Sequence, residues 1–91
     1  MPSGGWDVSL GACSLQELMV APRQVQKRYR KKCEPDLRSR CDRPDGDTIK
    51  KLRGWRRVYR YRLGEYRVIY RVDLDLRLAT ILRVGHRRDV Y

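Results

Sequence analysis

The sequence predicts an α+β fold in which a mostly antiparallel, four-stranded sheet carries two helices packed on one face. From about residue 56 onward, arginine alternates with tyrosine, valine, isoleucine and leucine at a period of two, as in β-strands with one apolar face. Apolar residues between 25 and 33 instead recur at helical spacing. With 91 residues, the chain is expected to form a single domain, 1–91, with a flexible tail at 1–5.

The N-terminal half begins with a predicted strand and a short helix. Trp6, Val8 and Leu10 alternate with polar residues, as in a strand. Ser14 is expected to cap a helix that ends near residue 20, because Glu17 stands three residues later and completes a capping box.

A second helix is expected to start at Pro22, since proline suits the first turn of a helix. Its inward residues recur at four-residue spacing: Val25, Tyr29 and Cys33. Pro35 then either splits this helix or bends it near Cys33 or Glu34, and a short segment over 35–40 follows with Leu37 inward. Residues 43–47 form a turn rich in aspartate, proline and glycine.

The C-terminal half predicts a meander of three strands at about 56–63, 66–73 and 76–84, joined by tight turns at Gly64 and at 74–75. The apolar set of these strands should face the helices: Tyr59, Tyr61, Leu63, Tyr66, Val68, Tyr70, Val72, Leu76, Leu78, Thr80, Leu82 and Val84. The other face should gather arginines: Arg60, Arg62, Arg67, Arg71, Arg83 and, if the last strand continues past Gly85, Arg87. Trp55 is expected to pack at the edge of the sheet.

The charge of the chain indicates an anionic partner. The net charge is +11, and 13 of the 22 basic residues lie from Lys50 onward, against 4 of the 11 acidic ones. Guanidinium groups bind phosphate bidentately and repel one another when they share a face, so nucleic acid is the first candidate. A merely soluble surface is the alternative, but it does not explain the alternation. Duplex DNA is less favoured, because the basic face lies on a sheet and no recognition-helix pattern is present.

Several classes of protein are disfavoured by the sequence. Cys13, Cys33 and Cys41 have no metal-ligand spacing and only one histidine is present, so neither a disulfide framework nor a metal site is expected, and no cofactor is implied. No apolar run is long enough to span a membrane, and the N-terminus lacks the pattern of a signal peptide. A cytoplasmic protein with reduced thiols is the expectation.

The cationic meander also resembles a known family. In order along the chain, the segments KLRG, VYRYR, GEYRVIYRV and ILRVGHRRDVY resemble the RelE-like toxins of bacterial and archaeal type II toxin–antitoxin systems. The resemblance covers residues 49–91 well and reaches the N-terminal strand and helices more loosely. It implies the RelE-like fold and the function of a toxin.

The resemblance further implies a metal-independent endoribonuclease that depends on the ribosome and cuts mRNA in the ribosomal A site, an mRNA interferase. In this chemistry the ribose 2′-OH attacks the adjacent phosphorus and expels the 5′-oxygen, which leaves a cyclic phosphate. The motif positions of the family fall on five residues of this chain: Arg60, Arg62, Arg67, Arg87 and Tyr91. Arg67 and Arg87 are expected to stabilise the charged phosphorus, and Tyr91 to stack on or orient the substrate base.

The strand that carries Arg60 and Arg62 departs from the family pattern, because better-known members have lysines there. Arginine does not deprotonate in proteins, so these two residues are expected to orient the RNA backbone and to act electrostatically rather than as bases. They have salt bridging, for example to Glu65, as their alternative role. His86 is the only side chain with an ordinary pKa near neutrality and is the candidate acid or base, with a structural or solvated role as the alternative.

Further RNA contacts are expected from Arg57, Arg71, Arg83 and Arg88. The basic outer face of the second helix is either solvated or contacts ribosomal RNA: Lys27, Arg28, Arg30, Lys31 and Lys32.

The expected partners are the ribosome, mRNA and a cognate acidic antitoxin, in a toxin–antitoxin hetero-oligomer without membrane contact. Two other functions stay open: a ParE-like toxin that does not cut RNA and inhibits DNA gyrase, and an inactive homologue that only binds its antitoxin.

Overall fold

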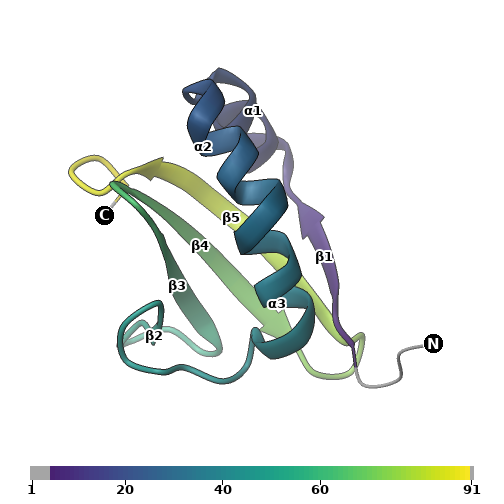
Figure 1. Cartoon of the computed structure of the whole chain (residues 1–91). Coiled ribbons are helices and arrows are strands. Elements are labelled where there is room, and N and C mark those ends of the chain that lie inside the picture. Colours follow the sequence, from purple (N-terminus) through teal and green to yellow (C-terminus); the bar gives the residue numbers. More distant parts are fainter. Residues whose placement is uncertain (1–4, 91) are drawn as a thin grey trace.

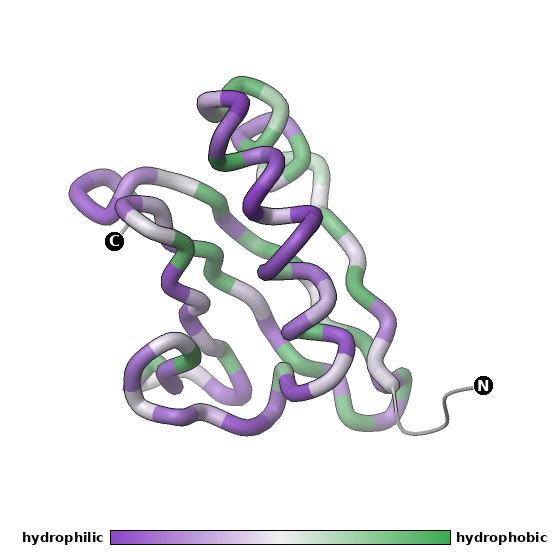
Figure 2. Tube along the Cα trace, viewed as in Figure 1, coloured by the Kyte–Doolittle hydropathy of each residue, from purple (hydrophilic) through white to green (hydrophobic). Residues whose placement is uncertain are grey.

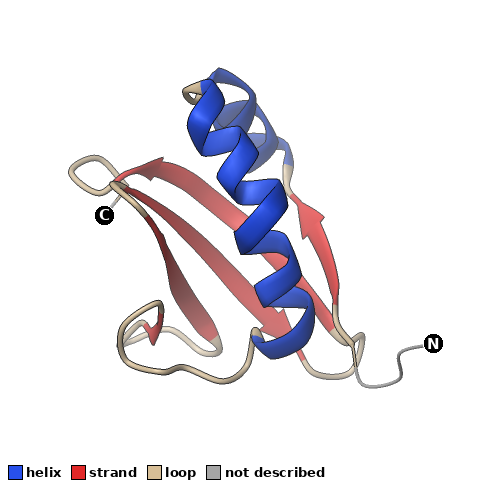
Figure 3. Cartoon of the chain, viewed as in Figure 1, coloured by secondary structure: helices blue, strands red, loops and turns tan. Residues whose placement is uncertain are grey.

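The computed structural model describes residues 5–90, which form a sheet with helices across one face (Figures 1 and 3). In chain order the elements are β1 (Asp7–Leu10), α1 (Ala12–Val20), α2 (Arg23–Arg28), the π-helical turn η1 (Tyr29–Cys33), α3 (Glu34–Arg40), β2 (Ile49–Lys51), β3 (Val58–Leu63), β4 (Tyr66–Asp73) and β5 (Leu78–His86). The predicted α+β fold is confirmed. Residues 1–4 of the predicted tail lie outside the described residues.

The sheet has five strands in the order β1-β5-β4-β3-β2, one more than predicted. The additional strand, β2, has three residues and pairs antiparallel with β3 at the edge of the sheet. It was missed because three residues after a polar turn are too few to show a period of two. β1 pairs parallel to β5, and the other pairs are antiparallel as predicted.

The segment from α2 to α3 is one continuous helical rod, so Pro35 does not split it. The buried positions recur every four residues: Val25, Tyr29, Cys33, Leu37 and Cys41. In a regular α-helix, residues four positions apart differ by about 40° in direction around the helix axis. A stripe of buried residues at this spacing would therefore turn away from the sheet. The π-helical turn, in which the Glu34 amide donates to the Tyr29 carbonyl, adds one residue and brings the stripe back. The same widened turn precedes Pro35 and accommodates its missing N–H.

The first helix starts differently from the prediction. It begins at Ala12 after Gly11, and Ser14 is a fully buried residue whose hydroxyl donates to the Ile81 carbonyl at 2.7 Å. Glu17 does not complete a capping box. Its carboxylate accepts the backbone N–H of Val84 at 2.8 Å and thereby joins α1 to the edge of β5.

The predicted inward set is correct on β3 and β4 but wrong on the first half of β5. Tyr59, Tyr61, Val68 and Tyr70 are buried under the helices as expected. On β5 the buried residues are Ala79, Ile81 and Val84, rather than Leu78, Thr80 and Leu82. The cause is a β-bulge: Ile69 pairs with Arg83 and Tyr70 with Ile81, so Leu82 is the extra residue and the alternation changes phase there. Leu76, also placed in the inward set, lies in the β4–β5 turn and is exposed.

A second, smaller apolar cluster lies on the sheet face away from the helices, called the outer face from here on. It consists of Val58, Ile69 and Val90, with Leu52 and Leu82 packed against it. Figure 2 shows hydrophobic and hydrophilic positions following one another along the strands, and mostly hydrophilic positions along the helical rod. The outer face therefore has an apolar centre, and its arginines stand around that centre.

The Tyr70 hydroxyl joins the sheet to the end of the helical rod. It is buried and donates to the Cys41 carbonyl at 2.7 Å, and its ring stacks on Tyr59 with centroids 5.6 Å apart. We expect Tyr70→Phe to lower the free energy of unfolding by about 1–2 kcal/mol, because the Cys41 carbonyl loses its buried donor. Urea denaturation of both proteins measures the difference.

Tyr59→Phe is the matched control, since the Tyr59 hydroxyl forms no hydrogen bond within residues 5–90. An equal loss of stability in both variants would contradict the role assigned to the Tyr70 hydroxyl.

Candidate nucleic-acid interface

Cross-strand pairing brings the predicted arginines of β3 and β4 onto the outer face. Arg62 lies opposite Arg67, and Arg67 lies opposite Gly85 on its other side. One step along the strands, Arg60 pairs with Ile69. Residues directly opposite each other share a face of the sheet, so Arg62 and Arg67 form a cationic pair beside the β3–β4 turn.

The C-terminal turn closes over this part of the outer face. The His86 carbonyl accepts the amides of Asp89 at 2.8 Å and Val90 at 3.1 Å, which folds the chain back on itself. Val90 then packs on Gly85, where an added Cβ would lie 3.4 Å from the Val90 Cβ. Gly85 thus leaves room for Val90, and the turn is held beside the pair of arginines.

Arg87 is held at the same end of the sheet by two contacts with Glu65. Its amide donates to the Glu65 carbonyl at 2.8 Å, and its Nε lies 3.2 Å from the Glu65 carboxylate. The backbone contact continues the β4–β5 pairing beyond His86, so Arg87 joins Arg62 and Arg67 on the outer face as predicted. Glu65 pairs with Arg87, rather than with the two β3 arginines.

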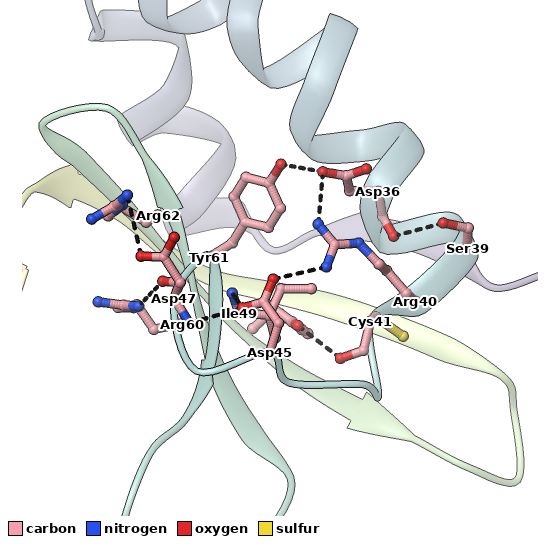
Figure 4. A network of polar contacts seen from close by, with 11 residues as sticks. Asp36, Ser39, Arg40, Cys41, Asp45, Asp47, Ile49, Arg60, Tyr61 and Arg62 are labelled. Carbon is pink, nitrogen blue, oxygen red and sulfur yellow. Dashed lines mark hydrogen bonds and ion pairs between the residues drawn. The ribbon is translucent and has the colours of Figure 1, made fainter.

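Asp47 holds the two β3 arginines instead (Figure 4). The Arg60 guanidinium donates to the Asp47 carbonyl at 2.6 Å, and Arg62 lies 3.2 Å from the Asp47 carboxylate. The Arg67 guanidinium donates to the carbonyls of Gly64 at 2.8 Å and Tyr66 at 3.0 Å. These contacts orient the three arginines and partly offset their repulsion. The sequence did not indicate Asp47 as a partner, since it lies in the turn before β2.

The loop that carries Asp47 is anchored by Asp45 (Figure 4). Asp45 accepts the amides of Asp47 at 2.8 Å and Ile49 at 3.0 Å, and Arg40 at 3.0 Å. These two amides, together with Arg40, hold the pKa of Asp45 well below its usual range. The loop therefore has a fixed shape that presents Asp47 to the outer face.

Two of the expected site residues are not brought to this cationic pair. Arg83 turns to the edge of the sheet, where its Nε lies 2.9 Å from the Glu17 carboxylate. His86 lies opposite Tyr66, which faces the helices, and its ring meets the Tyr66 ring edge-on with centroids 5.8 Å apart. The strand alternation that puts Arg87 on the outer face thus puts His86 on the other one. Tyr91 lies outside the described residues.

The other predicted RNA contacts lie elsewhere on the surface. Arg71 is exposed on β4 at the far end of the outer face, and Arg57 lies near it in the loop before β3. Arg88 is exposed in the C-terminal turn. Trp55 does not pack against the sheet edge, because 67% of its surface is exposed.

A second cationic surface lies between the helical rod and the end of β3. It is a groove of about 880 Å³, and its basic lining residues are Lys27, Arg28, Lys31, Lys32, Arg40 and Arg62. The Arg28 guanidinium reaches Gly64, so the groove meets the β3–β4 turn. We call it the helix groove. The sequence indicated the basic helix face, but only the packing shows that this face lines a groove.

The geometry suits binding of a phosphodiester and stabilisation of negative charge by fixed guanidinium groups. Within residues 5–90 there is no cluster of three potential metal ligands. The same described part of the chain has no helix that is long and apolar enough to cross a membrane. Burial raises the pKa of Cys33 and raises that of Cys41 to about 12, so these thiols stay protonated and belong to the core.

The ParE toxin model of the parDE type II toxin–antitoxin system matches residues 14–91. This chain belongs to the RelE/ParE toxin superfamily. It is thus a toxin of the type II toxin–antitoxin class, and no curated protein sequence is similar enough to count as a match.

Solved structures of RelE toxins share the fold. A RelBE complex from Mycobacterium tuberculosis has a TM-score of 0.78 and 26% identity, over 97% of this chain and 98% of that one. The archaeal RelE–RelB complex from Pyrococcus horikoshii has a TM-score of 0.76 and 25% identity, over 93% of this chain and 98% of that one. The RelB–RelE complex from Methanococcus jannaschii has a TM-score of 0.69 and 27% identity, over 88% of this chain and 91% of that one. These relatives were crystallised with their antitoxins. The family model that matches is thus one of ParE toxins, whereas these solved structures are of RelE toxins.

The anchor at Asp45 predicts a pH dependence of the loop that it holds. A carboxylate whose pKa is lowered by folding stabilises the folded form above its unfolded pKa of about 3.9, and this contribution is lost as the pH falls through the lower folded pKa. We expect the amides of Asp47 and Ile49 to stay protected from hydrogen exchange at pH 5 and to lose protection in strong acid. Asp45→Ala should abolish their protection at every pH.

Asp42→Ala is the control, since Asp42 accepts no hydrogen bond within residues 5–90. Unchanged exchange at Asp47 and Ile49 in Asp45→Ala would show that the anchor does not act.

Proposed function

We propose that the chain is a ribosome-dependent endoribonuclease that cuts mRNA with the outer face beside the β3–β4 turn. The observation that supports it is the convergence of Arg62, Arg67 and Arg87 at one end of the sheet, each with its guanidinium oriented by a contact of the chain. The likeness to RelE structures above and the family motifs that meet there support the same assignment.

The proposed chemistry is transfer of the phosphoryl group to the neighbouring 2′-oxygen. The 2′-oxygen forms a bond to phosphorus and gives up its proton to water, while the bond to the 5′-oxygen breaks and that oxygen takes a proton from water. The products are a 2′,3′-cyclic phosphate and a 5′-hydroxyl end. Arg67 and Arg87 stabilise the extra negative charge on the phosphorus oxygens, and Arg60 and Arg62 hold the neighbouring backbone. As the RNA binds, Arg62 and Arg87 exchange their contacts with Asp47 and Glu65 for contacts with the phosphates.

His86 takes a positioning role in this proposal. Its side chain packs against Tyr66, and its Nδ1 accepts the Arg88 amide at 3.2 Å. Through that contact and its carbonyl, His86 organises the turn that carries Arg87. The expected acid–base role requires the ring to reach the other face of the sheet.

A second candidate function is supported by the ParE family model, which matches residues 14–91. In that case the toxin acts on DNA gyrase without cutting RNA, and the outer face binds a protein. An inactive homologue that only binds its antitoxin is the third case.

Mapping of mRNA ends after expression in cells separates these cases. We expect cuts at codon positions on translating ribosomes and a rate lower by about 10²–10³-fold in Arg67→Ala and in Arg87→Ala, the loss typical of one transition-state donor. Arg38→Ala is the matched control, because this half-exposed arginine of α3 pairs with Glu34 of the same helix and with Asp7 of β1.

Intact mRNA together with gyrase-dependent DNA breaks would replace the nuclease by the ParE-like function. Growth arrest that persists in both arginine variants would exclude the outer face as the active surface.

We further propose that the helix groove receives an acidic segment of the cognate antitoxin. The groove has six basic lining residues, and Asp36 is its one acidic lining residue within the described part of the chain. Such a complex is a hetero-oligomer in which an extended or helical acidic segment lies between the rod and β3.

Affinity for the antitoxin is therefore expected to fall with rising salt. Lys27→Ala and Lys31→Ala should each weaken binding by about 2- to 5-fold at low ionic strength, the effect of one exposed charge pair, and should flatten the salt dependence. Arg23→Ala is the control, because Arg23 lies in the same helix but does not line the groove. Calorimetric titration at several salt concentrations measures all three, and equal losses in all three would contradict binding in the groove.

A further inference from the structure

Trp55 is the exposed tryptophan of this chain, and hydrogen bonds hold both ends of its loop. The other tryptophan, Trp6, is 4% exposed and lies under the Arg77 guanidinium at 4.1 Å. The Trp55 loop is fixed at both ends by backbone hydrogen bonds of 2.9 Å, from Leu52 to the Val58 carbonyl and from Val72 to the Arg57 carbonyl. A large aromatic side chain is thus presented to solvent on an ordered support.

The backbone of this loop is strained where it meets β4. Arg57 has a φ of 55°, in the left-handed region that an arginine rarely adopts. Such strain is kept where a particular geometry is required, and ligand clamps are among the usual places.

Trp55 lies in a pocket of about 690 Å³ at the end of the outer face that is far from the β3–β4 turn. Its lining combines an indole, two leucines and three arginines, and we call it the Trp55 pocket: Trp55, Arg56, Arg57, Arg71, Leu74 and Leu82. A flat aromatic surface beside guanidinium groups is the chemistry that binds an unpaired base together with its phosphate.

The arginines of this pocket differ from those at the other end of the face. Arg62 and Arg87 are paired with Asp47 and Glu65, whereas Arg56, Arg57 and Arg71 have no ion pair within residues 5–90. Asp73 and Asp75 also line the pocket on the side of the β4–β5 turn, and Asp73 accepts the Leu76 amide at 3.0 Å. The three cations therefore outnumber the acidic groups and stay available to an anion.

The pocket is continuous with the proposed cleavage site along a single strand. Arg67 and Arg71 both point to the outer face of β4, and four residues of a strand span about 13 Å. An RNA strand that lies on Arg67 and follows β4 reaches the pocket after a few nucleotides.

We propose that the Trp55 pocket binds an unpaired nucleotide of the same RNA strand, with the base stacked on the Trp55 indole and the phosphate on Arg56, Arg57 and Arg71. This inference extends the proposed function, because it adds a binding subsite outside the cleavage site. The inference requires that the chain bind single-stranded RNA, but it does not require that the chain cut this RNA.

Tryptophan fluorescence of the full chain tests it with a 9-nucleotide single strand of 2′-O-methyl RNA, in which the 2′-oxygen cannot attack. Stacking should quench the exposed indole on binding. Trp55→Leu should abolish the quenching and weaken binding, measured by anisotropy of a labelled strand, by about 5- to 150-fold, the range for loss of one stacked base. Arg67→Ala should weaken binding of the same strand but leave the quenching at saturation.

Val20→Ala is the matched control, since Val20 is 72% exposed at the end of α1 and outside the pocket, and it should bind as the original chain does. Equal quenching by polyglutamate, quenching by an RNA duplex, or unchanged affinity in Trp55→Leu would each overturn the inference. An affinity unchanged by Arg67→Ala would overturn the claim that one strand fills both sites. Cleavage on ribosomes that is normal in Trp55→Leu, with RNA affinity also unchanged, would reject the pocket and leave the nuclease function standing.

Discussion

The two-faced alternation of β4 is the constraint on which the rest of the structure depends. β4 lies in the middle of the sheet, with Val68 and Tyr70 fully buried under the helical rod and Arg67 and Arg71 on the outer face. A shift of one residue in its pairing would bury arginine and expose tyrosine. The register of β4 therefore determines both which residues form the core and where the cations lie. The Tyr70 hydroxyl joins this register to the helix layer through the Cys41 carbonyl.

The arginines of the outer face can lie close together because carboxylates of the same chain neutralise part of their charge. Asp47 and Glu65 hold arginines beside the β3–β4 turn, and Glu17 holds Arg83 at the edge of β5. These exposed pairs contribute little to stability, but they orient guanidinium groups before any ligand arrives. At the opposite end, around Trp55, Asp73 and Asp75 line the pocket but form no ion pair with its arginines within residues 5–90. Within the described part of the chain, the outer face thus has oriented, ion-paired arginines beside the β3–β4 turn and arginines without an ion pair around Trp55.

Parts of this arrangement were predictable because they depend on local sequence. The bounds of β4 agree with the predicted strand, and the inward residues of β3 follow from the period of two. The four-residue spacing of the buried residues in the helical rod was also visible in the sequence, but the sequence did not indicate that this spacing requires a π-helical turn. Only the packed rod shows that a π-helical turn corrects the rotation of that stripe and precedes Pro35.

The sequence by itself determined a cationic, two-faced antiparallel meander and the family motifs on it, because alternation is a property of each strand alone. The tertiary structure decided which residues of β5 face the core, since the bulge at Leu82 appears only when β5 is paired with β4. It also decided that His86 packs on Tyr66 and that Arg87 meets Glu65. These contacts join residues far apart in the chain, and their geometry is set by strand register and by the fold of the C-terminal turn onto Gly85.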